Sequence, residues 1–332
     1  MKTIKWGVIG SGWIAHMFAK TNQTIDNSEI IAIADVSLEI AKAYQKEFSV
    51  PRAYGSPEEM LQDPEIDAVY VATPHCFHKE GIKLALEHGK HVLCVKPITL
   101  CTAELEEVMA LAKQKGLLLM EAMWTRFKPE FQDARQKLLE GALGDIVLME
   151  GHCSFITPYQ PQGRMFNRKL GGGALMDVGV YVTSLADFFA GGDPVRIDAQ
   201  AHFGETGVDQ TTSILYQYEN GCTAYLNASI ESEERQDWTI VGTKGKIFID
   251  NIWYSTSYDI KMHGGEWETR SFGGSVSTQK EHHDFMIRAF NQCVRDGKTD
   301  SDVIPIETTC RVMRCMDTIR ERIGLQYDVS TK

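Results

Sequence analysis

Residues 1–122 alternate short, continuously apolar runs with amphipathic stretches. The apolar runs lie at 6–9, 30–34, 68–71, 91–94 and 117–120. Between the last two, Leu105, Val108, Met109 and Ala112 recur at helical spacing, and Gly116 is placed to end the helix. Apolar strands separated by helices are typical of a parallel sheet covered on both faces. The pattern therefore predicts a doubly wound, Rossmann-like α/β domain.

From about residue 123 the pattern changes to longer strand-like segments. A helix is expected near 130–140, another after Gly171-Gly172-Gly173, and two more at 281–296 and from Pro305. Turn dipeptides Asn220-Gly221, Lys244-Gly245 and Gly264-Gly265 favour hairpins. The strand-like segments lie at 146–155, 195–203, 211–218, 222–230, 238–250 and 258–270. We expect an α+β domain over 123–332 with a mostly antiparallel open sheet, its C-terminal helix either kept there or packed back on domain 1–122.

Composition argues against nucleic-acid binding, membrane association and metal binding. The net charge of −11 leaves no basic excess to neutralise nucleic acid or an anionic membrane. No basic-then-apolar leader opens the chain, and no apolar run approaches the ~18 residues of a membrane span. The eight cysteines form no Cys-x-x-Cys pair and no Cys/His cluster with zinc spacing. A cytoplasmic protein with reduced thiols and no metal is expected.

A glycine-rich turn follows the first apolar run. In such a turn the first glycine permits a tight bend, and the second lets the backbone approach a pyrophosphate. A small third residue allows close packing of helix and strand, and the helix N-terminus attracts negative charge. The segment reads Gly10-Ser11-Gly12-Trp13-Ile14-Ala15. It predicts a dinucleotide site in which residues 10–14 contact the cofactor.

Asp35 stands at the end of the second predicted strand, 25 residues after Gly10. Its carboxylate can accept hydrogen bonds from the adenosine ribose, or it can cap the next helix. An acidic group there repels a 2′-phosphate, and Val36-Ser37 offers no arginine to bind one. NAD is therefore favoured as the cofactor, and NADP stays possible because Arg52 could reach the site.

Lys96-Pro97 closes the predicted strand at 91–94. The carboxyl ends of parallel strands face the ligand crevice of a doubly wound sheet, so Lys96 is a candidate to bind the oxygen of an alcohol undergoing hydride transfer. By position alone, a solvated lysine before a loop proline is the stronger interpretation.

Five motifs in order carry a resemblance over residues 4–181. They are Gly10-x-Gly12-x-x-Ala15, Ala72-Thr73-Pro74-x-x-x-His78, Lys96-Pro97, Glu121-Ala122, and Gly171-Gly172-Gly173-Ala174-x-x-Asp177-x-Gly179-x-Tyr181. The series resembles the Gfo/Idh/MocA oxidoreductase family. Trp124-Thr125-Arg126-Phe127 is similar to the branch that contains dimeric dihydrodiol dehydrogenase and D-xylose dehydrogenase.

The resemblance implies roles for individual residues. Lys96 would be the catalytic lysine, bonded to the reacting hydroxyl and also near the cofactor, with a bond to Pro97 that is often cis in relatives. Asp177 and Tyr181 match the family's acidic and His/Tyr positions. If helical they share a face, and Tyr181 could relay the proton. The alternative makes Asp177 a helix-start residue and Tyr181 a packing aromatic.

Further positions follow from the same resemblance. Substrate-pocket residues would be Trp124, Arg126 and Phe155, although a core tryptophan and a surface arginine are the alternative for the first two. The loop beside the nicotinamide would carry Thr73, Pro74, His75 and His78, with a structural helix-entry role equally open for His78.

One departure bears on catalysis. Val95 stands where the family has Glu before the lysine, which removes a possible partner of Lys96. The expected function is a dehydrogenase acting on a secondary hydroxyl of a sugar, polyol or cyclic diol, and the alternative is an NAD(P)-binding sensor. A homodimer or larger homo-oligomer is expected, because an antiparallel sheet can leave one face uncovered for a second subunit.

Overall fold

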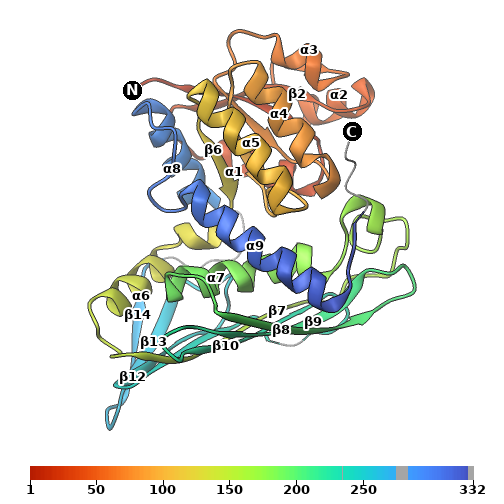
Figure 1. Cartoon of the computed structure of the whole chain (residues 1–332). Coiled ribbons are helices and arrows are strands. Elements are labelled where there is room, and N and C mark those ends of the chain that lie inside the picture. The colour runs from red at the N-terminus through yellow and green to blue at the C-terminus, as the bar shows by residue number, and fades with distance from the viewer. Residues whose placement is uncertain (234, 274–282, 328–332) are drawn as a thin grey trace. The chain divides into compact units, whose positions relative to one another are not determined.

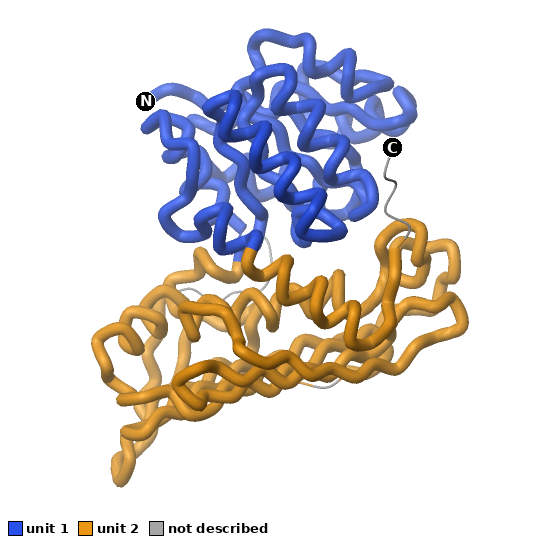
Figure 2. The backbone as a smooth tube through the Cα atoms, in the orientation of Figure 1, with its two compact units in different colours: residues 1–124, 280–310 blue, residues 125–279, 311–332 orange. Residues whose placement is uncertain are grey.

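The computed structural model describes residues 1–233, 235–273 and 283–327. Contacts divide the chain into two compact units, drawn in two colours in Figure 2. Unit 1 comprises Met1–Trp124 with Lys280–Cys310, and unit 2 comprises Thr125–Gln279 with Arg311–Lys332. Each unit is therefore built from two separate stretches of chain, whereas the sequence predicted one boundary after residue 122.

The sheet of unit 1 has six parallel strands in the order β3-β2-β1-β4-β5-β6. They are β1 Ile4–Ile9, β2 Ser28–Ala34, β3 Arg52–Tyr54, β4 Ala68–Val71, β5 His91–Val95 and β6 Leu119–Ala122. In β4 and β5, neighbouring residues such as Val69 and Tyr70 are both buried although they point to opposite faces. Both faces are thus covered, and the predicted doubly wound sheet is confirmed.

The helices of unit 1 fall into two packed groups. They are α1 Trp13–Asn22, α2 Leu38–Phe48, α3 Pro57–Leu61, α4 His78–Glu87, α5 Thr102–Lys115 and α8 His283–Arg295. As predicted, α5 ends at Gly116, which has a φ of +66°. In α8, the Phe290 ring lies 4.9 Å from the Trp6 ring of β1, and Arg295 donates to the Lys2 and Asn27 carbonyls. These contacts hold α8 in unit 1.

The sheet of unit 2 has eight strands in the order β14-β13-β12-β11-β7-β10-β9-β8. Among the strand pairs that the described residues form in this sheet, only β7–β10 is parallel, so the predicted, mostly antiparallel sheet is confirmed. The predicted segments 238–250 and 258–270 are each a hairpin. The strands are β7 Ile146–Ser154, β8 Arg196–Phe203, β9 Asp209–Gln217, β10 Thr223–Ser229, β11 Trp238–Gly242, β12 Gly245–Ile249, β13 Ser257–Met262 and β14 Trp267–Ser271.

Two helices, α6 (Pro129–Leu139) and α7 (Val180–Ala190), pack on one face of this sheet, and α9 (Ile306–Ile323) follows near the C-terminus. Among the described residues, Figure 1 shows no helix on the opposite face. The helical stretch Arg168–Ala190 is long and apolar enough to cross a membrane, but 94% of its apolar window is buried in the protein. It is a core helix by that measure.

Candidate active site

The glycine turn between β1 and α1 leaves space for a diphosphate. Gly10 has a φ of +89°, and a Cβ there would lie 2.9 Å from the Ala72 carbonyl oxygen. A Cβ on Gly12 would meet no protein atom within 4 Å. No side chain caps the start of α1, and Ala15 is fully buried against the sheet. The free helix amides and the open approach at Gly12 fit a dinucleotide phosphate.

Asp35 follows β2 and hydrogen-bonds to Ser11 in this glycine turn. Its Oδ2 atom accepts hydrogen bonds from the Ser11 amide (3.0 Å) and the Ser11 hydroxyl (2.7 Å). Arg52, the other candidate for this region, forms ion pairs with Asp63 (3.0 Å) and Glu65 (2.7 Å). Its guanidinium is therefore engaged by acidic groups, and Asp35 stays next to the glycine turn.

His78, the first residue of α4, ties together two loops at the carboxyl ends of β4 and β5. Its ring is fully buried, with Nδ1 2.8 Å from the Pro97 carbonyl oxygen and Nε2 2.8 Å from that of Thr73. The short helix η1 (His75–Phe77) precedes it and follows Pro74. The ring nitrogens of His78 thus contact the protein itself, which supports the structural alternative that the sequence left open.

Lys96 lies on the second of these loops. The Lys96–Pro97 peptide bond is cis, and the lysine is half-buried. The next amide along, that of Ile98, donates to Oε1 of Glu121, a buried carboxylate at the end of β6 (3.1 Å). His78 and Glu121 therefore both contact the peptide group between Pro97 and Ile98, His78 at its carbonyl and Glu121 at its amide. Val95 is buried in the core.

Trp124 and Arg126 have protein partners in different units. The Trp124 ring is 4% exposed in unit 1 and packs edge-on against His283 at 4.7 Å. The Arg126 side chain is 2% exposed in unit 2 and donates to the Ser184 hydroxyl and carbonyl and to Asp187, all on α7. Because these donors hold α7, the structure favours an anchoring role for Arg126.

Asp177 and Tyr181 lie one turn apart where a single π turn, η4 (Leu175–Gly179), runs into α7. The helix predicted after the triple glycine is present, and it contains both residues. Asp177 forms an ion pair with Arg164 at 2.8 Å, and the Tyr181 ring packs edge-on against Trp253 at 5.7 Å. Phe155 lies 6.1 Å from the same tryptophan ring. Unit 2 thus places Asp177 and Tyr181 one turn apart, with the Trp253 ring against Tyr181 and Phe155 next to that tryptophan.

The buried carboxylate of Asp209 in β9 binds the start of the helical stretch that carries Asp177 and Tyr181. Asp209, the first residue of β9, is fully buried, and its Oδ2 accepts from the Leu175 amide (2.7 Å) and the Thr212 hydroxyl (2.6 Å). Gly173 has a φ of +123°, and a Cβ there would lie 2.2 Å from Asp209 Oδ1. Glycine is therefore required at 173, since the carboxylate occupies the space of a side chain.

Burial raises the pKa of Asp209 to about 6, although its hydrogen bonds from Thr212 and Leu175 oppose the shift. The folded state therefore binds a proton more tightly than the unfolded chain, and stability declines as pH rises from about 4 to about 6. We expect Asp209→Asn to remove a pH-dependent change of about 3 kcal/mol in unfolding free energy over that window. Urea unfolding of both proteins at several pH values measures it, and parallel curves for the two would contradict the assignment.

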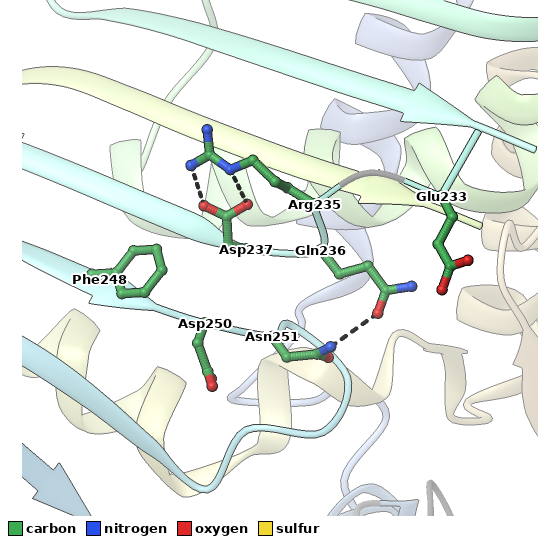
Figure 3. Close-up of a pocket in the computed structure, with 7 residues that line it drawn as sticks. All are labelled: Glu233, Arg235, Gln236, Asp237, Phe248, Asp250 and Asn251. Atoms are coloured by element: carbon green, nitrogen blue, oxygen red, sulfur yellow. Dashed lines mark hydrogen bonds and ion pairs between the residues drawn. The ribbon is translucent and has the colours of Figure 1, made fainter.

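A cavity of about 360 Å³ opens elsewhere in unit 2, by β11 and β12. In Figure 3, Arg235 points to Asp237 and Asn251 to Gln236, while Asp250 lies nearby. None of the residues predicted from the sequence lines this cavity. Its polar side chains largely hydrogen-bond to one another. We therefore do not assign the oxidoreductase chemistry to this cavity.

Comparison with known families decides the affiliation. The model described as "Oxidoreductase family, NAD-binding Rossmann fold" matches residues 4–123, and the "GFO/IDH/MocA C-terminal domain" matches residues 131–248. The chain belongs to the Gfo/Idh/MocA oxidoreductase family. As a member it is an NAD(P)-dependent oxidoreductase, and the glycine turn described above is where its residues fit the dinucleotide.

Similar proteins match along nearly the whole chain. Trans-1,2-dihydrobenzene-1,2-diol dehydrogenase of Mus musculus is 32% identical over 334 residues, which cover 98% of each chain. The 3-ketoreductase KijD10 of Actinomadura kijaniata, solved with NADP and TDP-benzene, is 28% identical with a TM-score of 0.86, covering 97% of this chain and 98% of that one. Levoglucosan dehydrogenase, solved with NADH and levoglucosan, is 21% identical with a TM-score of 0.86 and covers 97% of each chain, so it shares the fold.

Three residues around the site were missed by sequence reasoning: Arg164, Asp209 and Trp253. Arg164 precedes the triple glycine by seven positions, and an arginine before an acidic motif could have been flagged. Asp209 and Trp253 lie 32 and 76 residues after Asp177 and belong to no motif, so the sequence offered no signal for them.

Proposed function

We propose that this oxidoreductase oxidises a secondary hydroxyl of a cyclic diol, sugar or polyol, with Lys96, Asp177 and Tyr181 as its catalytic residues. The observation that carries the proposal is the Lys96 loop, held by His78 and Glu121 at the carboxyl end of β5 in the NAD(P)-binding unit. The names of the relatives support the substrate class, since the murine protein is a dehydrogenase of a cyclic trans-diol and KijD10 is a 3-ketoreductase.

The role proposed for each site residue follows from the chemistry of its side chain. When bound, the nicotinamide supplies hydride acceptance or donation. Residues 10–14, Asp35 and the Thr73–His75 loop would bind the cofactor, and Lys96 would donate a hydrogen bond to the reacting oxygen. Tyr181 would take up the hydroxyl proton, with Asp177 keeping local negative charge beside it. Trp124 and Phe155 would supply apolar walls for the substrate.

A panel assay tests the proposal. Purified protein with NAD is offered trans-cyclohexane-1,2-diol, aldoses and inositols, and NADH absorbance is followed. Turnover of at least one secondary alcohol is expected. Val95, buried where the family has Glu, favours an NAD(P)-binding sensor as the second candidate. No turnover with any compound, together with measurable NAD binding, would decide for the sensor.

The cofactor preference gives a separate prediction. The Asp35 carboxylate would repel the 2′-phosphate of NADP, so NAD is proposed as the better cofactor. Asp35→Ala with Val36→Arg is expected to shift the ratio of kcat/KM for NADP over NAD upward by about 100-fold, which is about 3 kcal/mol. Steady-state kinetics with both cofactors measure the ratio.

Glu39→Ala is the matched control, because it removes an exposed carboxylate from the first turn of α2 without touching Ser11. It should leave the ratio unchanged. A wild-type protein that already prefers NADP would show that Asp35 has no such role.

We also propose that the protein forms a homo-oligomer through the open face of the unit 2 sheet, and that it is located in the cytoplasm. On that face Leu215 and Tyr225 pair across β9 and β10 and are 46% and 41% exposed. All eight cysteines are free thiols, which suits a reducing compartment. Light scattering should give more than one subunit, and Leu215→Glu should lower the mass; a monomeric wild type would refute the assembly.

A further inference from the structure

The loop before the triple glycine carries an arginine that the proposed mechanism does not use. Nη1 of Arg164 lies 2.8 Å from Oδ1 of Asp177. The Asp177 side chain is 8% exposed and that of Arg164 is 51% exposed. One proposed catalytic carboxylate is therefore paired with a cation whose side chain is half-exposed.

Backbone packing fixes the loop that carries this arginine. A Cβ on Gly172 would lie 2.5 Å from the Arg164 carbonyl oxygen and 2.7 Å from that of Met165. The Gly173 amide donates to the Met165 carbonyl at 2.9 Å, and the Asp177 amide donates to the Gly173 carbonyl. Glycine at 172 thus lets the loop lie directly on the start of the helix. The motif therefore fixes the backbone that carries Arg164, and its partner Asp177 is only 8% exposed, so the pair is better shielded than one between two exposed side chains.

The charge of Arg164 acts on both proposed catalytic groups. The Asp177 carboxylate is the main cause of a raised pKa of Arg164, and Tyr181 raises it further. Such an interaction is mutual, so the guanidinium favours the ionised form of each partner. From the 250–256 loop, the neighbour of the Tyr181 ring is the uncharged indole of Trp253. Tyr181 is 6% exposed, which keeps water from screening the effect fully.

We propose that Arg164 is a positioning residue of this site: it holds Asp177 as a carboxylate and favours the deprotonated form of Tyr181. The inference rests on the proposed roles of Asp177 and Tyr181. In the oxidative direction the substrate carbon loses a hydride, for which bound NAD would be the acceptor, and the O–H bond breaks as the C=O bond forms. The phenolate oxygen of Tyr181 gains that proton and becomes a phenol. Because the neighbouring guanidinium favours the phenolate, Tyr181 is deprotonated at lower pH. The pH range of turnover therefore extends toward neutral pH.

The test follows the ionisation of Tyr181 by tyrosinate absorbance in the intact protein. The difference between each protein and its Tyr181→Phe counterpart isolates this residue. Arg164→Met should move the titration upward by about one pH unit, and Arg164→Lys, which keeps the charge, should restore about half of that shift. Lys169→Met is the control, because it removes an exposed cation from the same loop.

Kinetics provide a second readout. The pH profile of kcat/KM for oxidation of trans-cyclohexane-1,2-diol should move upward with the titration, so that Arg164→Met loses about tenfold at neutral pH and recovers at alkaline pH. A structural role would instead lower turnover equally at every pH. An unshifted titration in Arg164→Met, or a Lys variant as impaired as the Met variant, overturns the inference.

The outcomes separate this inference from the proposed function. Near-normal turnover of Tyr181→Phe would contradict the function proposed for Tyr181, while the titration would still report whether Arg164 acts on it. Should Arg164→Met fail to fold, Arg164→Gln takes its place, since its amide can still hydrogen-bond Asp177 without charge, and the same shift is required of it.

Discussion

Lys96→Ala is expected to lower kcat by about 10³-fold while leaving the Kd for NAD within about twofold. The lysine is assigned to the reacting oxygen, whereas the glycine turn that fits the diphosphate is formed by other residues. Steady-state assays with the active diol or sugar give kcat, and isothermal titration with NAD gives Kd.

Lys83→Ala is a suitable control for this experiment. Lys83 lies on α4 of the same unit, 39% exposed and 3.6 Å from Glu107, so its loss changes charge without touching the Lys96 loop. It should retain normal kinetics. A kcat near the wild-type value in Lys96→Ala would remove Lys96 from the catalytic set, and a lost NAD affinity would assign it to the cofactor instead.

Gly10→Ala and Gly12→Ala are expected to have different effects: the first should lower folding stability, and the second should weaken NAD binding. Gly10→Ala puts a Cβ at a φ of +89° and 2.9 Å from a backbone oxygen, so we expect it to cost about 2–4 kcal/mol of folding stability. Gly12→Ala meets no protein atom and has a φ of −69°, so the stability should change by less than about 1 kcal/mol. Its methyl group would occupy the approach to the diphosphate, so Kd for NAD should rise at least about tenfold.

Thermal unfolding of the cofactor-free protein and titration with NAD separate the two effects. The comparison is its own control, because both variants add one methyl group to the same turn. Equal NAD affinity in Gly12→Ala and wild type would show that the second glycine does not face the cofactor.

The fold could be predicted from the sequence where its elements carry their own periodicity. The apolar runs at 30–34, 68–71 and 91–94 gave β2, β4 and β5 almost to the residue, and Gly116 marked the end of α5. The three-residue strand β3 was missed because Arg52–Tyr54 is only half-buried throughout and has no apolar run. β6 begins at Leu119, two residues later than predicted, since Leu117 and Leu118 extend the apolar run beyond the sheet.

The site could be predicted only as far as its motifs reach. Glycine spacing and Lys96-Pro97 are local signals, so the sequence located them. The partners of these residues come from distant segments: Arg126 binds Asp187, Asp209 holds the Leu175 amide, and Trp253 packs on Tyr181. No spacing rule connects such positions, because tertiary packing alone brings them together. Arg126 shows the consequence, since a residue predicted at the substrate is buried and bonded to Ser184 and Asp187 of α7.

The return of α8 to the first unit has a consequence for protein engineering. A fragment cut after Trp124 would lack Phe290 and expose the Trp6 surface it covers, so a simple truncation would be prone to aggregate. Because Arg295 binds the carbonyl of Lys2 at 2.9 Å, the end of α8 lies next to the start of the chain. A circular permutant that places α8 ahead of Met1 through a short linker would therefore encode a continuous, transplantable cofactor-binding module.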